Sequence, residues 1–251
     1  VLTINDKVKA DINDEHRQHV MRNHSATHLM HKALKETLGN HIEQKGSLVD
    51  RYRTRFDFSH PKPLTPEEKT SIELMVNQEI LKNQTTQAKV MDIDAAKKTG
   101  AMMLFGEKYG DAVRTIRFGQ SIELCGGTHV NNTADIWHFK MTSESAVASG
   151  IRRIEAITND AVKDFYFENN RAYFEMKDLL NNAKEPVKAL QNLQAENTDL
   201  KKEIEGLLKD KAKNIKGELK NELTEINGIQ FLAKRLDLDA SGIKDVCFDL
   251  G

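Results

Sequence analysis

The chain contains two short motifs whose side chains are typical metal ligands. His24-Ser-Ala-Thr-His28 is followed, much later in the chain, by Cys125-Gly-Gly-Thr-His129. Together they offer three imidazoles and one thiol, and the simplest purpose common to both motifs is a single Zn²⁺ site. Histidines at this spacing lie on one face of a helix, roughly 5 to 6 Å apart at their Cβ atoms, so both can reach one ion. The sequence therefore predicts a zinc site made of His24, His28, Cys125 and His129.

Neither motif is specific when it stands alone. A His-x3-His pair is usually two unrelated histidines, and an isolated cysteine is usually a small buried hydrophobe. Their combination favours a metal site, and the two glycines after Cys125 would let the backbone turn sharply and approach a ligand closely. His31 continues the face of His24 and is interpreted as a packing or supporting residue. Two alternatives stay open, since four protein ligands form a closed structural site whereas catalytic zinc keeps an open position.

The first motif argues against one familiar kind of zinc hydrolase. A metalloprotease helix reads His-Glu-x-x-His, and its glutamate acts as general base beside the metal-bound water. Ser25 stands in the position of that glutamate. Peptide hydrolysis of this kind is therefore not expected, whereas an activated ester could be hydrolysed by a positioned water beside a polarising metal.

Five blocks of sequence, in order, resemble the editing domains of the alanyl-tRNA synthetase family. The blocks are Asn23-His-Ser-Ala-Thr-His-Leu-Met30, Glu43-Gln-Lys-Gly-Ser-Leu-Val49, Arg55-Phe-Asp-Phe-Ser-His60, Glu123-Leu-Cys-Gly-Gly-Thr-His129 and Ser149-Gly-Ile-Arg-Arg-Ile-Glu155. The free-standing AlaX trans-editing proteins and the editing domain of threonyl-tRNA synthetase are similar more distantly. The Cys-Gly-Gly-Thr-His form favours the alanyl branch.

The resemblance implies that the chain deacylates tRNA(Ala) carrying the wrong amino acid, chiefly serine and also glycine. Such a second hydrolytic sieve has a physical purpose, because glycine fits any alanine pocket and a small apolar pocket rejects an added hydroxyl only weakly. The family's zinc ligands fall on the four residues of the two motifs. Its editing-pocket residues fall on Thr27 and Gln44, and Ser47 follows in the same loop. Their polar groups could bind the serine hydroxyl or orient water, although ordinary packing and loop roles are the alternative.

Hypotheses of two classes remain open at this stage. The chain is either a zinc-dependent aminoacyl-tRNA deacylase or a zinc-stapled tRNA-binding module without significant catalysis alone. Its parent is expected to be alanine–tRNA ligase, of which it would be a fragment, with a long AlaX-type trans-editing protein as the alternative. The phosphate-binding pattern Gly-x4-Gly-Lys-Ser/Thr is absent, so ATP binding and amino-acid activation would belong to the parent.

Composition is compatible with this interpretation. The chain has 251 residues, of which 39% are hydrophobic and 30% charged, and Cys125 and Cys247 are its two cysteines. These features favour a cytoplasmic protein in a reducing compartment, and no apolar run is long enough to span a membrane. The net charge is only −1, so any contact with RNA would rely on a local basic patch.

Four arginines are candidates for contact with the 3′ end and acceptor stem of tRNA(Ala). Alternation in residues 44–58 predicts one or two strands, with Arg51, Arg53 and Arg55 on one face. Arg152 and Arg153 would point to opposite faces of a later strand, so that one could meet RNA while the other makes a structural ion pair. For Arg51 and Arg53, an ordinary solvated face is the alternative.

The predicted fold is α+β, with a mixed or antiparallel sheet, packed helices and a following helical hairpin. Helices are expected over residues 13–38, ending at Gly39, and from Pro66 to about Asn83, capped by Thr65. We expect a zinc-containing editing domain over 1–158, a helical hairpin or linker over 159–226, and the start of a C-terminal domain over 227–251. Heptad spacing from Leu190 to Leu207 allows a spacer or a self-association contact, while Gly206 and Gly217 argue against one long rigid helix.

Overall fold

The computed structural model describes residues 3–4, 6–103, 109–238 and 240–250. The chain divides into two compact units, Val1–Asn169 and Asn170–Gly251. The division falls within helix α4 (Asp160–Leu179), which begins at the end of the predicted editing domain. The functional boundaries expected at residues 158 and 226 stay a prediction, because compactness alone does not define them.

The first unit is built from antiparallel sheets and helices, which confirms the α+β class. Its further elements are α1 (Asp14–Leu38), β1 (Gln44–Val49), β2 (Thr54–Ser59), α2 (Pro66–Leu81), β3 (Gln87–Asp92), α3 (Ile93–Lys98), β4 (Ala112–Phe118), β5 (Ser121–Leu124), the short η1 (Thr133–Ile136), β6 (Phe139–Ala148) and β7 (Ile151–Thr158).

Local sequence signals fix the ends of the two main helices. The side chain of Asn13 accepts a hydrogen bond from the His16 backbone at the start of α1, and Gly39, with φ of 113°, ends that helix. Thr65 and Glu68 form a capping box at the start of α2, where proline occupies the first turn. Both predicted helices are confirmed.

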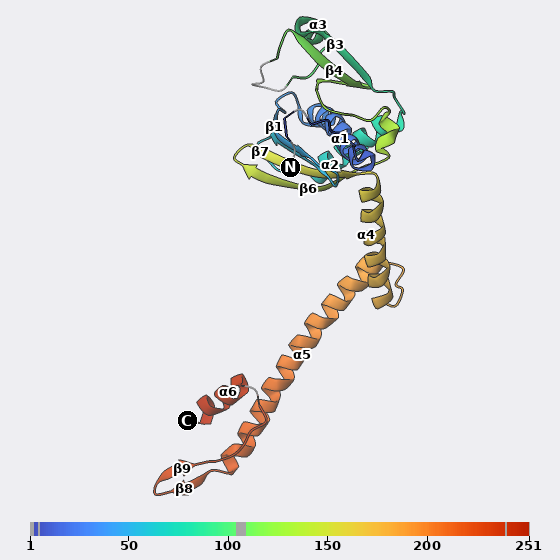
Figure 1. Ribbon diagram of the computed structural model, residues 1–251. Coiled ribbons are helices and arrows are strands. Elements are labelled where there is room, and N and C mark those ends of the chain that lie inside the picture. Colours follow the sequence, from blue (N-terminus) through green and yellow to red (C-terminus); the bar gives the residue numbers. More distant parts are fainter. Residues whose placement is uncertain (1–2, 5, 104–108, 239, 251) are drawn as a thin grey trace. The chain divides into compact units, whose positions relative to one another are not determined.

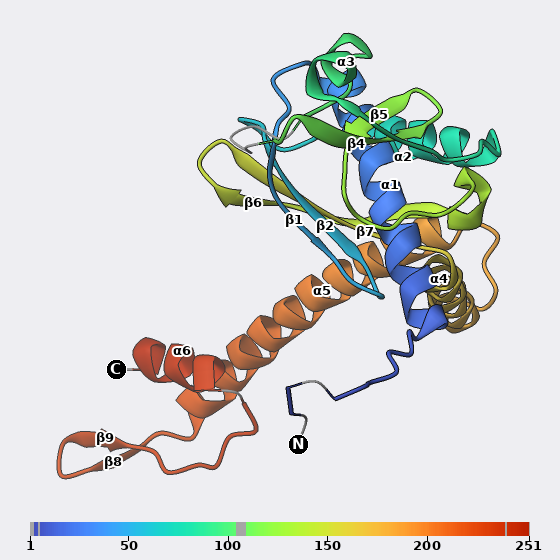
Figure 2. The ribbon, with the colours of Figure 1, turned by 45° about the horizontal axis from the view of Figure 1, so that its top comes forward.

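The two helices lie between two sheets (Figures 1 and 2). One sheet has the strand order β1-β2-β7-β6 and the other β3-β4-β5, and neighbouring strands are antiparallel throughout. A single core joins them, because Leu34 of α1, Phe56 of β2 and Phe118 of β4 are buried in the same hydrophobic cluster. Helix α1 is therefore held from both sides, which makes it a rigid base for the histidines that it carries.

The prediction that Arg51, Arg53 and Arg55 share a strand face is wrong. A turn separates β1 from β2, and its backbone is fixed because the Asp50 side chain accepts hydrogen bonds from the backbone amides of Tyr52, at 2.7 Å, and Arg53, at 2.9 Å. Arg51 and Arg53 lie in this turn, and only Arg55 belongs to a strand.

In the second unit, α5 (Pro186–Asn221) runs for 36 residues without interruption. Gly206 and Gly217 were expected to argue against one long helix, and this expectation is wrong, since each glycine costs only about 1 kcal/mol relative to alanine. Helix α5 packs on α6 (Ala240–Leu250) through Leu219 and Val246. The strands β8 (Thr224–Ile226) and β9 (Ile229–Phe231) form a hairpin between these helices. Two helices, α4 and α5, thus follow residue 158 as predicted, and their packing as a helical hairpin stays a prediction.

None of the helices in the described part of the chain is long and apolar enough to cross a membrane.

Candidate metal centre

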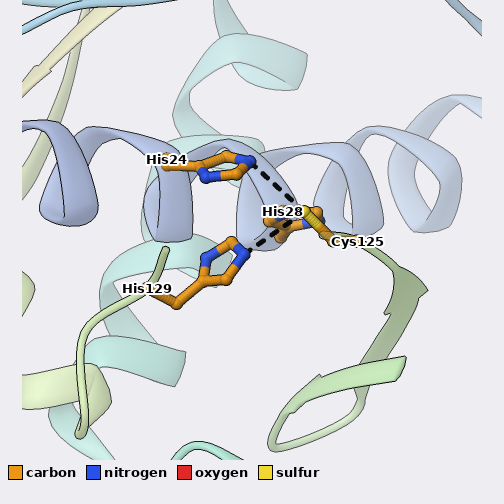
Figure 3. Close-up of side chains that lie close together, drawn as sticks. All are labelled: His24, His28, Cys125 and His129. Carbon is orange, nitrogen blue, oxygen red and sulfur yellow. Dashed lines mark hydrogen bonds between the residues drawn. The ribbon is translucent and has the colours of Figure 1, made fainter. Parts of the chain in front are cut away.

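The structure brings together the four side chains that the two motifs predicted as metal ligands (Figure 3). Their ligand atoms all lie within 4.8 Å of one another. His24 and His28 project from α1, while Cys125 directly follows β5 and His129 lies in the next loop. The Cys125 Sγ atom is 3.6 Å from His24 Nε2 and 3.3 Å from His129 Nε2. Three imidazoles and one thiol therefore converge on a space of the size that one ion needs.

Each histidine on the helix uses its second ring nitrogen for a hydrogen bond outside the cluster. His24 Nδ1 lies 3.2 Å from the carbonyl oxygen of Thr128, and His28 Nδ1 lies 2.5 Å from Glu123 Oε2. A nitrogen that donates to an oxygen leaves the other nitrogen of a neutral ring with a free lone pair. In a metal-bound form, the Nε2 atom of each ring would therefore face the ion with its lone pair.

His129 is oriented in the same way by a residue of the first motif. Its Nδ1 atom lies 3.2 Å from the Ser25 hydroxyl oxygen, and that oxygen accepts a hydrogen bond of 3.2 Å from the backbone amide of Val130. Ser25 is completely buried behind the imidazole. It supports His129 and does not face a substrate. Ser25 therefore shares the sequence position of the catalytic glutamate of metalloproteases but not its role.

Whether these residues suit a metal can be judged from a buried ring nitrogen that lacks a hydrogen-bond partner among the described residues. His28 Nε2 has no hydrogen-bond partner among the described residues, although it is shielded from solvent. Leaving such a polar atom unsatisfied is costly, and a metal ion in the cluster would satisfy it. One sulfur and three imidazole nitrogens are also ligands that zinc favours. The residues therefore fit zinc, and the metal itself stays a proposal.

Electrostatics prepares two of the ligands in the form that binds metal. Burial raises the pKa of the Cys125 thiol, but hydrogen bonds from His129 and His24 outweigh it and lower that pKa to about 3. Burial lowers the pKa of His129 to about 4, which keeps this imidazole neutral. Burial also opposes the charge on His28, yet the Glu123 carboxylate outweighs it and raises the His28 pKa to about 10. Metal binding would therefore displace a proton from His28.

His31 stands beside the cluster and is not one of its ligands. Its Nδ1 atom lies 3.1 Å from Glu123 Oε1, and its ring packs against Phe56. Glu123 thus joins His31 to His28 through its two carboxylate oxygens. This agrees with the interpretation of His31 as a supporting residue.

The loop that carries Cys125 is shaped by one arginine and one glycine. Arg114 Nη1 donates to the carbonyl oxygens of Cys125, at 2.9 Å, and Gly127, at 2.8 Å. A Cβ atom on Gly127 would lie 2.4 Å from His24 Cε1, whereas one on Gly126 would meet nothing within 4 Å. Of the two glycines in the motif, it is Gly127 that the close approach to the histidine requires.

This difference predicts unequal effects for two neighbouring substitutions. Gly127→Ala should push the His24 ring out of the cluster and lower zinc affinity by about tenfold or more, because misplacing a ligand weakens a metal site at least as much as losing a supporting hydrogen bond. Gly126→Ala is the matched control and should bind zinc normally. Zinc affinity can be measured for both by competition with a chromophoric chelator, and equal affinities would contradict the assigned geometry.

The predicted pocket residues come from two neighbouring elements, with Thr27 on α1 and Gln44 and Ser47 on β1 of the four-stranded sheet. Thr27 is buried, and its hydroxyl is 2.8 Å from the Asn23 carbonyl oxygen and 2.6 Å from Thr54 Oγ1. Gln44 begins the edge strand β1, where Ser47 is exposed. A direct role of Thr27, Gln44 and Ser47 in substrate binding stays a prediction. For Thr27, that role would have to use a hydroxyl that is already hydrogen-bonded within the protein.

All four arginines proposed to contact tRNA take part in ion pairs. Arg51 lies 4.0 Å from Glu15 and Arg53 lies 3.0 Å from Glu155. The arginines of β7 are held more firmly, since Arg153 makes two hydrogen bonds to Asp57, at 2.6 and 2.7 Å, and Arg152 pairs with the buried Glu144. Their contact with tRNA stays a prediction.

Three supporting residues were missed at the sequence level, namely Ser25, Arg114 and Glu123. One signal could have found Glu123, because residues two apart in a strand point to the same side. Glu123 and Cys125 have this spacing at the end of β5. Ser25 and Arg114 gave no comparable signal, since their contacts depend on how the loop folds back on the helix.

Fold and site together define an α+β domain with a cluster of three histidines and one cysteine that could hold a metal ion. A family model described as "Threonyl and Alanyl tRNA synthetase second additional domain" matches residues 113–155, which include Cys125 and His129. The chain is also similar to proteins named alanine–tRNA ligase. It is 54% identical over 244 residues to that of Christiangramia forsetii and 51% identical over 243 residues to that of Flavobacterium psychrophilum.

These matches cover nearly all of the chain but a minor part of its relatives. The first spans 97% of this chain and 28% of the C. forsetii protein, and the second spans 96% and 27%. The alanine–tRNA ligase of Thiobacillus denitrificans is 48% identical over 254 residues, with coverage of 97% and 28%. Over nearly its whole length the chain is therefore similar to one segment of the alanine–tRNA ligases, and that segment contains the second additional domain, in agreement with the resemblance of the five blocks.

Proposed function

We propose that this segment hydrolyses the ester of mischarged tRNA(Ala), chiefly seryl- and glycyl-tRNA(Ala). The observation that carries the proposal is the convergence of His24, His28, Cys125 and His129 within 4.8 Å, beside loops of a synthetase-family domain. His28 and His129 are buried, whereas His24 and Cys125 are half-buried. An aminoacyl ester could therefore approach the centre from the side of His24 and Cys125.

Different residues of the chain would serve different parts of the reaction. Zinc held by the four ligands would supply a Lewis acid that orients and polarises the ester. Ser25 and Glu123 keep their histidines in a fixed orientation, so that binding requires little rearrangement. In this proposal Thr27, Gln44 and Ser47 favour a seryl over an alanyl ester by hydrogen-bonding the serine hydroxyl.

The second candidate is a zinc-stapled module that binds tRNA without significant catalysis alone. The observation in its favour is the number of protein ligands, because four side chains around one ion are typical of structural zinc. An origin in a long AlaX-type protein is disfavoured by relatives named alanine–tRNA ligase that match nearly the whole chain. A cytoplasmic setting and self-association through α5 remain predictions.

Deacylation by the zinc-loaded chain tests the proposal directly. We expect it to release serine from seryl-tRNA(Ala) well above the uncatalysed rate and to leave alanyl-tRNA(Ala) nearly intact, because the second sieve must spare the correct product. Removal of zinc with a chelator should abolish this activity, and adding zinc back should restore it. Release of serine at the uncatalysed rate by a folded, zinc-loaded chain would favour the binding module instead.

A further inference from the structure

A hollow of about 110 Å³ lies on one face of the sheet β3-β4-β5. Antiparallel register places its residues side by side, since Arg117 of β4 pairs with Gln87 of β3 and Ile122 of β5, and Lys89 pairs with Thr115. The hollow is lined by Gln87, Lys89, Met91, Thr99, Thr115, Arg117 and Ile122. Two cations and several neutral polar groups therefore share a small concave surface, and none of the described residues that line it is a carboxylate.

In the part of the chain that the structure describes, the two cations of this hollow have no partner for their charge. Neither the Lys89 ammonium nor the Arg117 guanidinium makes an ion pair or a hydrogen bond among the described residues, and both side chains are exposed. The ammonium offers three N–H donors and the guanidinium five, arranged as a planar fork. Two such cations held on adjacent strands form a surface that fits the oxygens of a phosphate group.

A second hollow of the first unit, and the arginines predicted to contact RNA, differ in this respect. The hollow between α2 and β6 contains Lys69 and Lys140, but these lysines pair with Glu144, at 3.2 Å, and Glu73, at 3.0 Å. The arginines that the sequence offered for RNA contact are likewise neutralised by nearby carboxylates. Positive charge is available at Lys89 and Arg117 without breaking an existing pair.

The opposite face of the same strands supports the metal centre. Phe118 of β4 lies 5.9 Å from His28 and 5.2 Å from His129, measured between ring centroids, and Glu123 of β5 holds His28. Arg117 and Ile122, the adjacent residues in sequence, line the hollow. A group bound in the hollow would thus be held by the same small sheet that positions the ligands.

We propose that this hollow binds a backbone phosphate of the RNA substrate through Arg117 and Lys89. The assignment rests on the proposed function, since it takes the substrate from there. Arg117 contributes a two-point contact to phosphate oxygens and Lys89 a point charge. Gln87 adds a neutral amide donor beside the same oxygens, whereas the Thr99 and Thr115 hydroxyls donate to the backbone carbonyls of Ala96 and Lys89.

Binding of uncharged tRNA(Ala) to the zinc-loaded chain tests this assignment independently of catalysis. Arg117→Ala and Lys89→Ala should each weaken binding by about tenfold and reduce the slope of log affinity against log salt by about one, as expected for loss of one phosphate contact. Arg117→Lys should keep part of the affinity. Lys62→Ala, an exposed cation outside the hollow, is the matched control and should bind as the unaltered chain does.

The outcomes separate this inference from the proposed function. Unchanged tRNA affinity in Arg117→Ala, with zinc content and thermal unfolding also unchanged, would overturn the phosphate site even if the chain deacylates seryl-tRNA(Ala). Weaker tRNA binding in that variant supports the site even if the chain has no deacylase activity. Inorganic phosphate serves as a second probe, and a variant that loses phosphate binding while keeping full tRNA affinity would contradict the assignment to RNA.

Discussion

Cys125→Ala should abolish tight zinc binding, with the largest effect of any single substitution in the chain. The thiolate is the only sulfur ligand of the cluster, and its pKa of about 3 keeps it ionised and ready to bind metal. Its loss removes a bond to the ion itself, so zinc affinity should fall by more than the roughly 10- to 100-fold that follows from losing a hydrogen-bond partner of a ligand. Deacylation should be lost with the metal.

Cys247→Ala is the matched control for this prediction. Cys247 is the second cysteine of the chain and lies exposed on α6, outside the metal cluster. It should retain the zinc content and affinity of the unaltered chain. Zinc is measured by competition with a chromophoric chelator, and retention of tight binding by Cys125→Ala would show that the cluster does not hold the metal.

Thermal unfolding of Cys125→Ala also separates the two kinds of zinc site. A structural metal contributes directly to folding, so the variant would unfold at a much lower temperature or fail to fold. A metal needed mainly for the reaction would leave a folded chain that binds tRNA and does not deacylate it. Each result selects one of the two alternatives that the sequence left open.

Features that depend on neighbouring residues were predictable from the sequence. Asn13, Gly39 and Thr65 gave the ends of the two main helices, because capping chemistry is local. His24 and His28 could be placed on one face for the same reason, since helical spacing alone decides it. Spacing alone could not predict that these two histidines share a site with Cys125 and His129. The resemblance of the five ordered blocks supported that part of the prediction.

Features that depend on strand register and on loop closure were not predictable. The partner of Arg153 is Asp57 because β2 and β7 align those two residues, and no local pattern specifies that alignment. Arg51 and Arg53 fell in a turn because Asp50 closes it with its own side chain. The need for Gly127 appears only when the loop lies against His24.

Glu123→Ala should weaken zinc binding and destabilise the fold at the same time. The buried carboxylate holds His28 at 2.5 Å and His31 at 3.1 Å, and its removal leaves both Nδ1 atoms without a partner. Zinc affinity should fall about 10- to 100-fold, the range typical for loss of a ligand's hydrogen-bond partner. Unfolding of the zinc-free chain should become easier by about 3 to 5 kcal/mol, as for other broken buried pairs. Glu123→Gln should lie between, since one amide oxygen replaces two carboxylate oxygens.

Glu144→Ala separates the role of Glu123 at the metal from its role in stability. Glu144 is equally buried, with 3% of its side chain exposed, and pairs with Arg152 and Lys69 away from the metal cluster. Its replacement should destabilise the fold by a similar amount and leave zinc affinity unchanged under conditions where the variant is folded. Denaturant unfolding and chelator competition measure the two effects separately. Glu144 makes no hydrogen bond to His28. If Glu123→Ala and Glu144→Ala lost zinc affinity equally, the hydrogen bond between Glu123 and His28 would have no effect of its own on zinc binding, and Glu123 would act on the metal only through general stability.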